Sequence, residues 1–439
     1  MSIKSFFRDT HTKIINNELA KSTIKNLSWL VIYRVFTMVI GVFVTALVAR
    51  NFGPELYGKF NYALSFVVLF SAFSTLGLET LAVKALIDKE YDEGTILFTS
   101  FLMRLFGGII LIIMTYLLII IIEPNDKSLH YLVVILSLSM VFKSFEVIEY
   151  WIEAHQKAKL SSIIRMISYV IFAILRIILV IWGGTLFQLS FIYLVNTIII
   201  GIGLSFGYFI NKKYKIKWKI SINFAKNMLR KSSFIILSGL MVTIYMQIDK
   251  VMLGALMASN SEVGIYSVAV SVSQMWYFVP IAVITSFKPV VMKAKKESAY
   301  SYKKSLRIMY SIITWIGIIF GFFIMLFSAP IVNVLFGADY SRAANVLSVT
   351  VWSGTFALLG TASSIWMINE GLIKYSTIFI FFGAAINVIL NVILIPVIGG
   401  YGAAIATLVT QVSVNIIIPF IFVKTRQNTI IILKSFIFK

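Results

Sequence analysis

The 439-residue sequence contains no cysteine and only three histidines, His11, His130 and His155. The absence of cysteine excludes disulfides, thiolate nucleophiles and cysteine-ligated metals. The histidines form no cluster, and we interpret them as solvated polar residues. Charged residues make up only 13% of the chain. Negatively charged residues are the scarcer kind, with 18 Asp and Glu against 39 Lys and Arg. A membrane transporter rather than an enzyme is therefore expected, with no cofactor.

Apolar residues are abundant, at 59% of the chain with a mean hydropathy of +0.93. A membrane-crossing helix needs about 20 predominantly apolar residues, and the sequence contains twelve such runs. They lie near 27–49, 60–82, 95–121, 131–151, 161–181, 187–210, 233–257, 266–292, 308–327, 345–368, 375–397 and 402–423. These runs predict an all-α integral membrane protein with twelve transmembrane helices. The polar, basic segment 1–26 shows no pattern of a removable signal peptide.

The distribution of Lys and Arg predicts the orientation, because positively charged loops stay in the cytoplasm. With segment 1–26 inside, the outer loops hold only Arg50, Lys59, Lys127 and Arg342. Both termini, including the tail 424–439, are therefore predicted to be cytoplasmic. The net charge of +21 is then explained by topology and by attraction to anionic membrane lipids, rather than by nucleic-acid binding.

The longest inner connection, 211–232, divides the chain into two six-helix lobes, 27–210 and 233–423. It is basic and sparsely amphipathic, which predicts an interfacial helix. A weak repeat supports the division, because Gly58, Phe60 and Ala63 recur as Gly264, Tyr266 and Ala269. Two halves of six spans insert with the same orientation, an arrangement found in transporters that rock two bundles about a central site.

Seven cations lie inside the predicted spans, and their burial is the main sign of function. They are Arg34, Arg104, Lys143, Arg165, Arg176, Lys250 and Lys288. A cation in the hydrocarbon core costs roughly 2.5 to 3.5 kcal/mol, so such residues normally face water, a partner charge or a substrate. We predict that the first six line a path for an anionic substrate, while Lys288 reaches the headgroups. The alternative for each is a structural ion pair between helices.

Few carboxylates are available as partners for these cations. Glu79, Glu146, Glu149 and Asp249 are candidate ion-pair or coupling groups. Lys143, Glu146, Glu149 and Glu153 fall on one side of the fourth span, which predicts a polar stripe that faces other helices or water. Asp249 is also a candidate site for coupling transport to a proton or sodium gradient, since carboxylates within membranes serve in such relays.

Five segments resemble the polysaccharide transporter branch of the multidrug, oligosaccharidyl-lipid and polysaccharide exporter superfamily, especially its Wzx-type O-antigen flippases. They are LVARNFGPELYGKFNYA from Leu47, LGLETLAVKAL from Leu76, DKVMLGALMASNSEVGIYSVA from Asp249, LFGADYSRAANVL from Leu335 and INVILNVILIPVIGGYGAAIATLVTQ from Ile386. They recur along nearly the whole chain and are specific for the branch but not for a substrate.

The resemblance implies a MATE-like, two-lobe flippase in the bacterial inner membrane. Such a protein moves an undecaprenyl-diphosphate-linked oligosaccharide from the inner to the outer leaflet, and it works beside a polysaccharide polymerase and a chain-length regulator. The family has a cationic central cavity, and the cations named above are expected to supply it here. The related lipid II flippases have extra spans that this chain lacks.

Two other functions are compatible with the sequence. A cation-coupled multidrug exporter of the same architecture would favour an acidic cavity, which seven cations against about five carboxylates argue against. A non-transporting scaffold of polysaccharide assembly would have no particular use for an internal duplication. A membrane glycosyltransferase would usually need a large extramembrane domain, which the sequence lacks.

Overall fold

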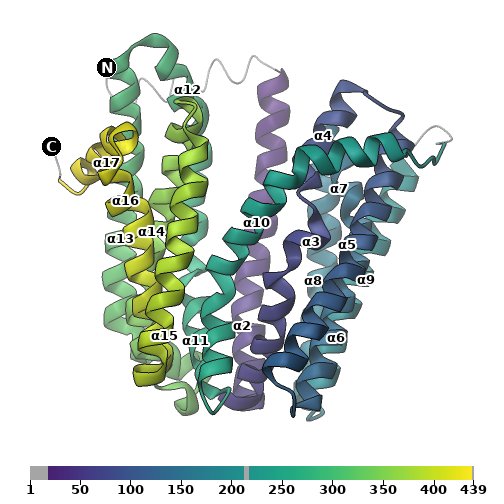
Figure 1. Cartoon of the computed structure of the whole chain (residues 1–439), viewed down its shortest axis with the longest axis vertical. Coiled ribbons are helices and arrows are strands. Elements are labelled where there is room, and N and C mark those ends of the chain that lie inside the picture. The colour runs from purple at the N-terminus through teal and green to yellow at the C-terminus, as the bar shows by residue number, and fades with distance from the viewer. Residues whose placement is uncertain (1–17, 212–216, 438–439) are drawn as a thin grey trace.

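The computed structural model describes residues 18–211 and 217–437, and helices dominate both ranges (Figure 1). Ten helical segments in these ranges are long and apolar enough to cross a membrane. They are Ser28–Leu69, Glu93–Ile122, Lys127–Ala154, Ala158–Ile181, Leu186–Asn211, Ile222–Leu256, Ser261–Glu297, Ala299–Phe336, Ala343–Asn369 and Ile373–Ile421. The prediction of an all-α membrane protein is confirmed at this level.

The described helices follow one another with short connections. They are α2 (Glu18–Leu69), α3 (Ser71–Thr75), α4 (Leu78–Asp88), α5 (Glu93–Ile122), α6 (Lys127–Phe142), η1 (Lys143–Val147), α7 (Ile148–Ala154), α8 (Ala158–Ile181), α9 (Leu186–Asn211), α10 (Ile222–Leu256), α11 (Ser261–Ser273), η2 (Met275–Tyr277), α12 (Phe278–Glu297), α13 (Ala299–Phe336), η3 (Ala338–Tyr340), α14 (Ala343–Asn369), α15 (Ile373–Val412), η4 (Ser413–Ile417), α16 (Ile418–Ile421) and α17 (Val423–Ser435).

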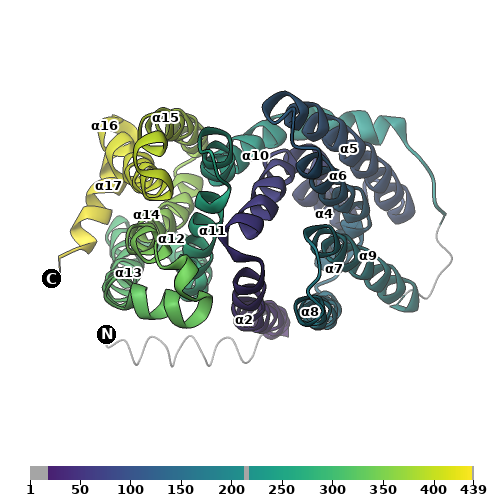
Figure 2. The same ribbon diagram turned by 90° about the horizontal axis from the view of Figure 1, so that it is seen from below.

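The helices gather in two groups that meet along α2, α10 and α11 (Figures 1 and 2). The N-terminal group comprises α2 to α9, and the C-terminal group comprises α10 to α17. The start of α10 and the turn between α12 and α13 lie at the upper end in Figure 1, while the turn between α10 and α11 lies at the lower end. The boundary between the two groups lies between α9 and α10.

Two of the ten membrane-crossing segments contain a break. Helix α2 is non-helical at Gly53, where φ is 71°, and Pro54 restarts the helix with its preset φ. Helix α15 is non-helical at Ile398 and Gly399, and Gly402 packs on Leu394, so its two halves fold back on each other. The sequence predicts a loop of ten residues at 50–59 between the first two spans, whereas the structure is helical there except at Gly53. Hydropathy overestimated the length of this loop because residues 54–59 have low hydropathy but are helical.

Helix α10 joins the predicted connection to the predicted seventh span without a break. It begins after Ser221, whose hydroxyl accepts the Phe224 N–H at 3.2 Å. The side chain of Phe224 is buried and its ring packs against Tyr91 of the N-terminal group at 5.2 Å. Since α10 contacts both groups, it connects them mechanically. Within the predicted tail, α17 is also helical, and Asn428 accepts a hydrogen bond from Tyr310 at 2.8 Å.

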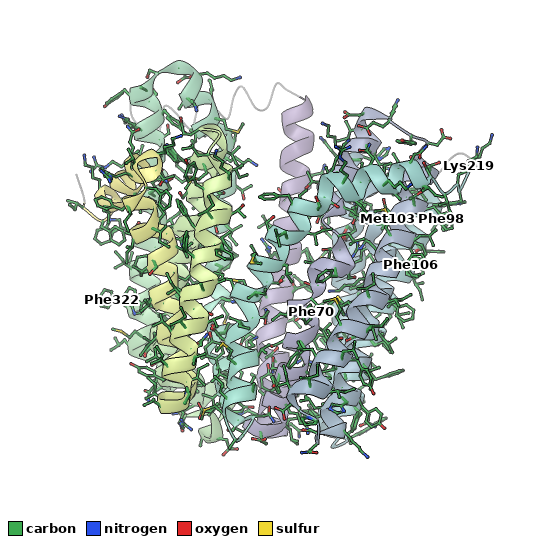
Figure 3. All side chains as sticks on the ribbon, viewed as in Figure 1. Phe70, Phe98, Met103, Phe106, Lys219 and Phe322 are labelled. Carbon is green, nitrogen blue, oxygen red and sulfur yellow. The ribbon has the colours of Figure 1, made fainter. Side chains whose placement is uncertain are left out.

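The outer surface of the bundle is apolar, as a lipid-facing surface requires. Phe106 and Phe322 project from opposite flanks and are more than half exposed (Figure 3). Arg104, Arg176 and Asp249 are instead buried between helices.

Candidate functional site

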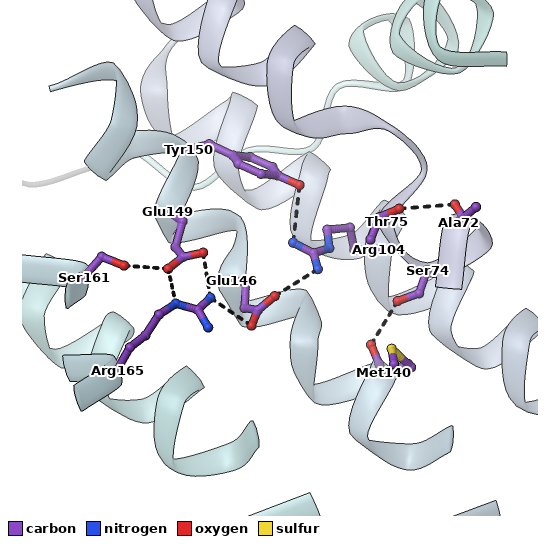
Figure 4. A network of polar contacts seen from close by, with 10 residues as sticks. All are labelled: Ala72, Ser74, Thr75, Arg104, Met140, Glu146, Glu149, Tyr150, Ser161 and Arg165. Atoms are coloured by element: carbon purple, nitrogen blue, oxygen red, sulfur yellow. Dashed lines mark hydrogen bonds and ion pairs between the residues drawn. The ribbon is translucent and has the colours of Figure 1, made fainter. Parts of the chain in front are cut away.

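A network of four charged side chains lies between α5, α8 and the η1–α7 segment (Figure 4). Arg165 binds both oxygens of Glu149, with Nε to Oε1 and Nη2 to Oε2 each at 2.7 Å. Its Nη2 also donates to Glu146 at 3.1 Å. The Ser161 hydroxyl donates to Glu149 at 2.6 Å. A bidentate pair of this kind fixes the orientation of both side chains.

Arg104 joins the same network from α5. Its side chain is 4% exposed, and Nη2 lies 3.5 Å from Glu146 Oε2. Nη1 donates to the Tyr150 hydroxyl at 3.3 Å, while Nε is buried without a hydrogen-bond partner. Glu146 thus bridges Arg104 and Arg165. The two arginines are thus paired with two carboxylates. This is the structural ion pair that the sequence analysis gave as the alternative to a role in binding an anionic substrate.

Lys143 adds a third cation at the edge of this network. It begins the 3₁₀ segment Lys143–Val147, in which residues three apart are eclipsed, so Lys143 and Glu146 project on the same side. Its ammonium interacts electrostatically with Glu146, Arg104 and Arg165. Three cations and two carboxylates leave one net positive charge here. Glu79 is exposed and forms no ion pair with any described residue.

Arg176 differs from the other buried arginines because no carboxylate of the described residues pairs with it. Its side chain is 5% exposed and its guanidinium lies 5.1 Å from the centre of the Phe172 ring. Nε is buried with no hydrogen-bond partner. Tyr57 and Tyr169 are its electrostatic neighbours. A buried cation without a counter-charge is costly, and the site can accept an anion.

The remaining predicted cations lie apart from one another. Arg34 on α2 and Lys288 on α12 are exposed, and neither forms an ion pair within the described ranges. Lys250 is half-buried on the face of α10 that turns toward α2. On that face the Thr243 hydroxyl donates to the Leu69 carbonyl at 2.9 Å. The structure therefore places Lys250 where the two groups meet.

A second polar cluster surrounds Asp249 inside the C-terminal group. The Asp249 side chain is 3% exposed, and its Oδ2 accepts hydrogen bonds from the Tyr266 hydroxyl at 2.6 Å and from the Thr407 hydroxyl. Oδ1 accepts from Asn391 Nδ2 at 2.6 Å, and that amide also contacts Asn387 Oδ1 at 3.1 Å. Asn391 Oδ1 and Asn387 Nδ2 are buried without partners.

Sequence reasoning found Asp249 but missed its four polar neighbours. The signal was present for Asn387 and Asn391, which are one helical turn apart in an otherwise apolar run. No His or acidic residue of the described ranges joins Asp249 in a group of three that could hold a metal. The cluster instead offers one carboxylate with hydroxyl and amide groups, which suits a small monovalent cation or a proton.

The two groups are held together at the lower end by backbone contacts. The Glu55 carboxylate accepts hydrogen bonds from the Asn260 and Ser261 N–H groups at 3.2 and 2.9 Å, and from the Ser259 hydroxyl. It thus caps the start of α11, where the helix dipole favours negative charge. The Tyr340 hydroxyl also donates to the Ala49 carbonyl at 3.0 Å. These contacts close this end of the molecule.

A cavity of about 320 Å³ lies between the groups beside these contacts. Helix α2 lines it with Met38, Gly41 and Thr45, and the C-terminal group contributes Ser271 and Gln274. A Cβ on Gly41 would meet the ring of Tyr169 on α8. Tyr169 is also an electrostatic neighbour of Arg176.

Comparison with known proteins identifies the family. The sequence profile described as "Polysaccharide biosynthesis protein" matches residues 23–295. The chain belongs to the polysaccharide biosynthesis protein family. The profile described as "MatE" also matches, over residues 235–393. The predicted membership in the exporter superfamily is confirmed, and this family's members are membrane transporters or flippases.

One curated sequence and two solved structures are similar to this chain at low identity. An uncharacterized membrane protein of Methanocaldococcus jannaschii is 27% identical over 287 residues, which cover 62% of this chain and 67% of the relative. A lipid II flippase MurJ in an inward closed conformation matches with a TM-score of 0.73, 17% identity and coverage of 92% and 90% of the two chains. An inward-facing MATE family multidrug resistance transporter matches with a TM-score of 0.63, 14% identity and coverage of 92% and 96%.

Proposed function

We propose that this protein is a flippase that carries an undecaprenyl-diphosphate-linked oligosaccharide, an O-antigen unit or a similar surface polysaccharide precursor, across the bacterial inner membrane. The observation that carries the proposal is Arg176, which is buried without a counter-charge in a chain of the polysaccharide biosynthesis protein family. A guanidinium can hold a diphosphate through two parallel hydrogen bonds. Lys143 and Lys250 would add positive charge along the route.

The orientation proposed here has twelve crossings, with both termini and the upper end of Figure 1 in the cytoplasm. The breaks at Gly53 and at Ile398–Gly399 divide two of the ten segments and supply the two additional crossings. The lower end, closed by Glu55, then faces the outer side. In this proposal the substrate enters from the cytoplasm, and rocking of the two groups would transfer it outward. The glycan would contact the polar side chains of the cavity, Thr45, Ser271 and Gln274.

Asp249 supplies the energy coupling in this proposal. Its carboxylate and the Asn387, Asn391 and Thr407 side chains provide several oxygen atoms, which is more than a proton requires and suits Na⁺. Asn387 Nδ2 and Asn391 Oδ1 lie beside Asp249 without hydrogen-bond partners. Their free hydrogen-bonding capacity supports a site in which the amide groups rearrange when a cation binds. Removal of the Na⁺ gradient is expected to slow translocation in the wild type, and Asp249→Asn is expected to abolish that dependence.

Reconstitution in liposomes tests the flippase proposal. Translocation of a fluorescent polyprenyl-diphosphate oligosaccharide is measured for the wild type, for Arg176→Gln and for Lys288→Gln as the matched control. Lys288 is an exposed cation that the sequence assigns to the headgroups. We expect a loss of at least about tenfold in rate only for Arg176→Gln, as removal of one buried charged contact gives. Normal translocation by folded Arg176→Gln would contradict the proposal.

A multidrug exporter is the second candidate, because the MatE profile covers Asp249 and its neighbours Tyr266, Asn387 and Asn391. A drug cation would be repelled by Arg176 and Lys143. Transport of a lipophilic cation by the same liposomes, at a rate unaffected by the diphospholipid-linked sugar, would favour this alternative.

A further inference from the structure

A pocket of about 480 Å³ opens at the lower end of the C-terminal group. It is separate from the cavity between the groups. The start of α11 contributes Glu262, the start of α14 contributes Arg342 and Asn345, and the break in α15 contributes Gly399 and Tyr401. Three of the five segments that carry the family resemblance meet here, and the residues that line the pocket take no part in the anion route or in the contacts that close the lower end.

Glu262 forms the charged wall of this pocket. Its side chain is 6% exposed, and Oε2 accepts the Gly400 N–H at 2.8 Å. The break in α15 frees that N–H, and Gly399 takes a φ of +55°, where a Cβ would collide with the Glu262 carboxylate. Oε1 lies 2.6 Å from Nη1 of Arg342, whose side chain is 67% exposed. One carboxylate oxygen is thus bound by backbone, and the other by an arginine at the surface.

The pocket adjoins the Asp249 cluster. Tyr266 follows Glu262 by one helical turn, so both side chains project from the same face of α11. The Tyr266 hydroxyl donates to Asp249, as does Thr407 from the second half of α15. A Cβ on Gly400 would lie 3.4 Å from Glu262 and 3.6 Å from Tyr266, which shows that these three residues pack together. The Tyr266 side chain therefore separates the pocket from Asp249.

We propose that this pocket is the outer entrance for the coupling cation, with Glu262 as the residue that selects it and Tyr266 as the barrier before Asp249. The proposal rests on the proposed coupling at Asp249 and on the proposed orientation. Arg342 holds the Glu262 oxygen that an arriving Na⁺ would bind, so that the carboxylate is not left unpaired at the membrane surface. Na⁺ competes with the guanidinium for this oxygen.

Opposite effects of two substitutions test the proposal. Translocation by proteoliposomes is measured while external Na⁺ is titrated at constant pH. Glu262→Gln keeps an oxygen for the Gly400 N–H but loses the charge, and we expect the half-maximal Na⁺ concentration to rise about fivefold. Arg342→Gln removes the competitor, and we expect that concentration to fall. A structural ion pair would instead shift both variants in the same direction, which would overturn the proposal.

A matched control and a labelling experiment complete the test. Glu370→Gln breaks the pair with Lys295, at 2.9 Å, at the upper end and should leave the external Na⁺ titration unchanged. Because the chain has no cysteine, Asn345→Cys provides a single thiol in the pocket. Membrane-impermeant cationic thiol reagents added outside should react faster than anionic ones, and Glu262→Gln should reduce that ratio. Reaction only from the inside would overturn the proposal.

The outcomes separate this inference from the proposed function. If translocation by the wild type does not respond to Na⁺, both the coupling at Asp249 and this entrance are wrong. If Asp249→Asn abolishes the response while Glu262→Gln titrates like the wild type, only the entrance is wrong.

Discussion

Gly58 and Gly264 occupy equivalent positions in the two halves of the chain, and they meet each other at the centre of the closed lower end. A Cβ on Gly58 would lie 2.9 Å from the Gly264 nitrogen, and a Cβ on Gly264 would lie 3.2 Å from the Gly58 nitrogen. This reciprocity is what a pseudo-two-fold axis between the halves produces. It allows α2 and α11 to cross in backbone contact, as small residues allow in membrane helices.

The substitution Gly264→Ala is expected to open the lower end. The new methyl group would collide with the Pro54 carbonyl, which is backbone and cannot rotate away. We expect a destabilisation of this state by about 1 to 3 kcal/mol, as overpacking typically costs. The measurements are the thermal unfolding midpoint and outer labelling of a cysteine placed between the groups, Thr45→Cys. Gly239→Ala is the control, because its nearest neighbour, the Ala72 Cβ, lies at 3.7 Å. Equal behaviour of the two variants would contradict this prediction.

Arg176 and Arg165 are expected to differ in their effect on stability. Arg176→Met should leave the unfolding midpoint unchanged or raise it, because it removes a buried charge that has no carboxylate partner. Arg165→Met should lower the midpoint, since it leaves Glu149 without its bidentate partner and costs about 1 to 3 kcal/mol. Thermal unfolding in detergent measures both. A lower midpoint for Arg176→Met would indicate that its contacts are structural.

Glu146 and Arg104 are expected to be energetically coupled. A double-mutant cycle between Arg104→Gln and Glu146→Gln should give an interaction energy of about 0.5 to 3 kcal/mol, as for other residues in contact. The reference cycle pairs Arg104→Gln with Glu297→Gln, whose partner Lys293 is on α12. That cycle should be additive. Additivity in both cycles would show that the 3.5 Å contact contributes nothing.

Asp126 provides a pH-dependent contribution to stability at the turn between α5 and α6. Partial burial of the Asp126 carboxyl raises its pKa. Hydrogen bonds from Lys59, Ser128 and the Leu129 N–H outweigh this effect and hold the pKa below its ordinary value. A lowered folded pKa means that this stabilisation is complete above about pH 4 and is lost as pH falls through the folded value. Asp126→Asn should therefore lower the unfolding midpoint at pH 7 but not at a pH well below the folded pKa of Asp126. The same deficit at both pH values would exclude the charge as its cause.

Part of the site could be predicted and part could not. The stripe of Lys143, Glu146, Glu149 and Glu153 follows from helical spacing. The structure pairs Glu146 and Glu149 with arginines on other helices, whereas Glu153 is exposed. The partner of that stripe, Arg165, is on another helix, and spacing within one helix carries no information about distances between helices. Asn387 and Asn391 were readable as a polar pair in an apolar run, whereas Tyr266 and Thr407 have no such signal because hydroxyl residues are common in membrane helices.

The sequence by itself determined that this is a membrane protein and which cations lie within its predicted spans. Hydropathy and the cost of a charge in lipid are properties of single segments, so the membrane helices and their seven cations could be recognised without a structure. Only the tertiary structure decided which cations keep a net charge, because pairing depends on distances between helices. It matched Arg104 and Arg165 with Glu146 and Glu149, left Arg176 without a carboxylate partner among the described residues, and surrounded Asp249 with Tyr266, Asn391 and Thr407.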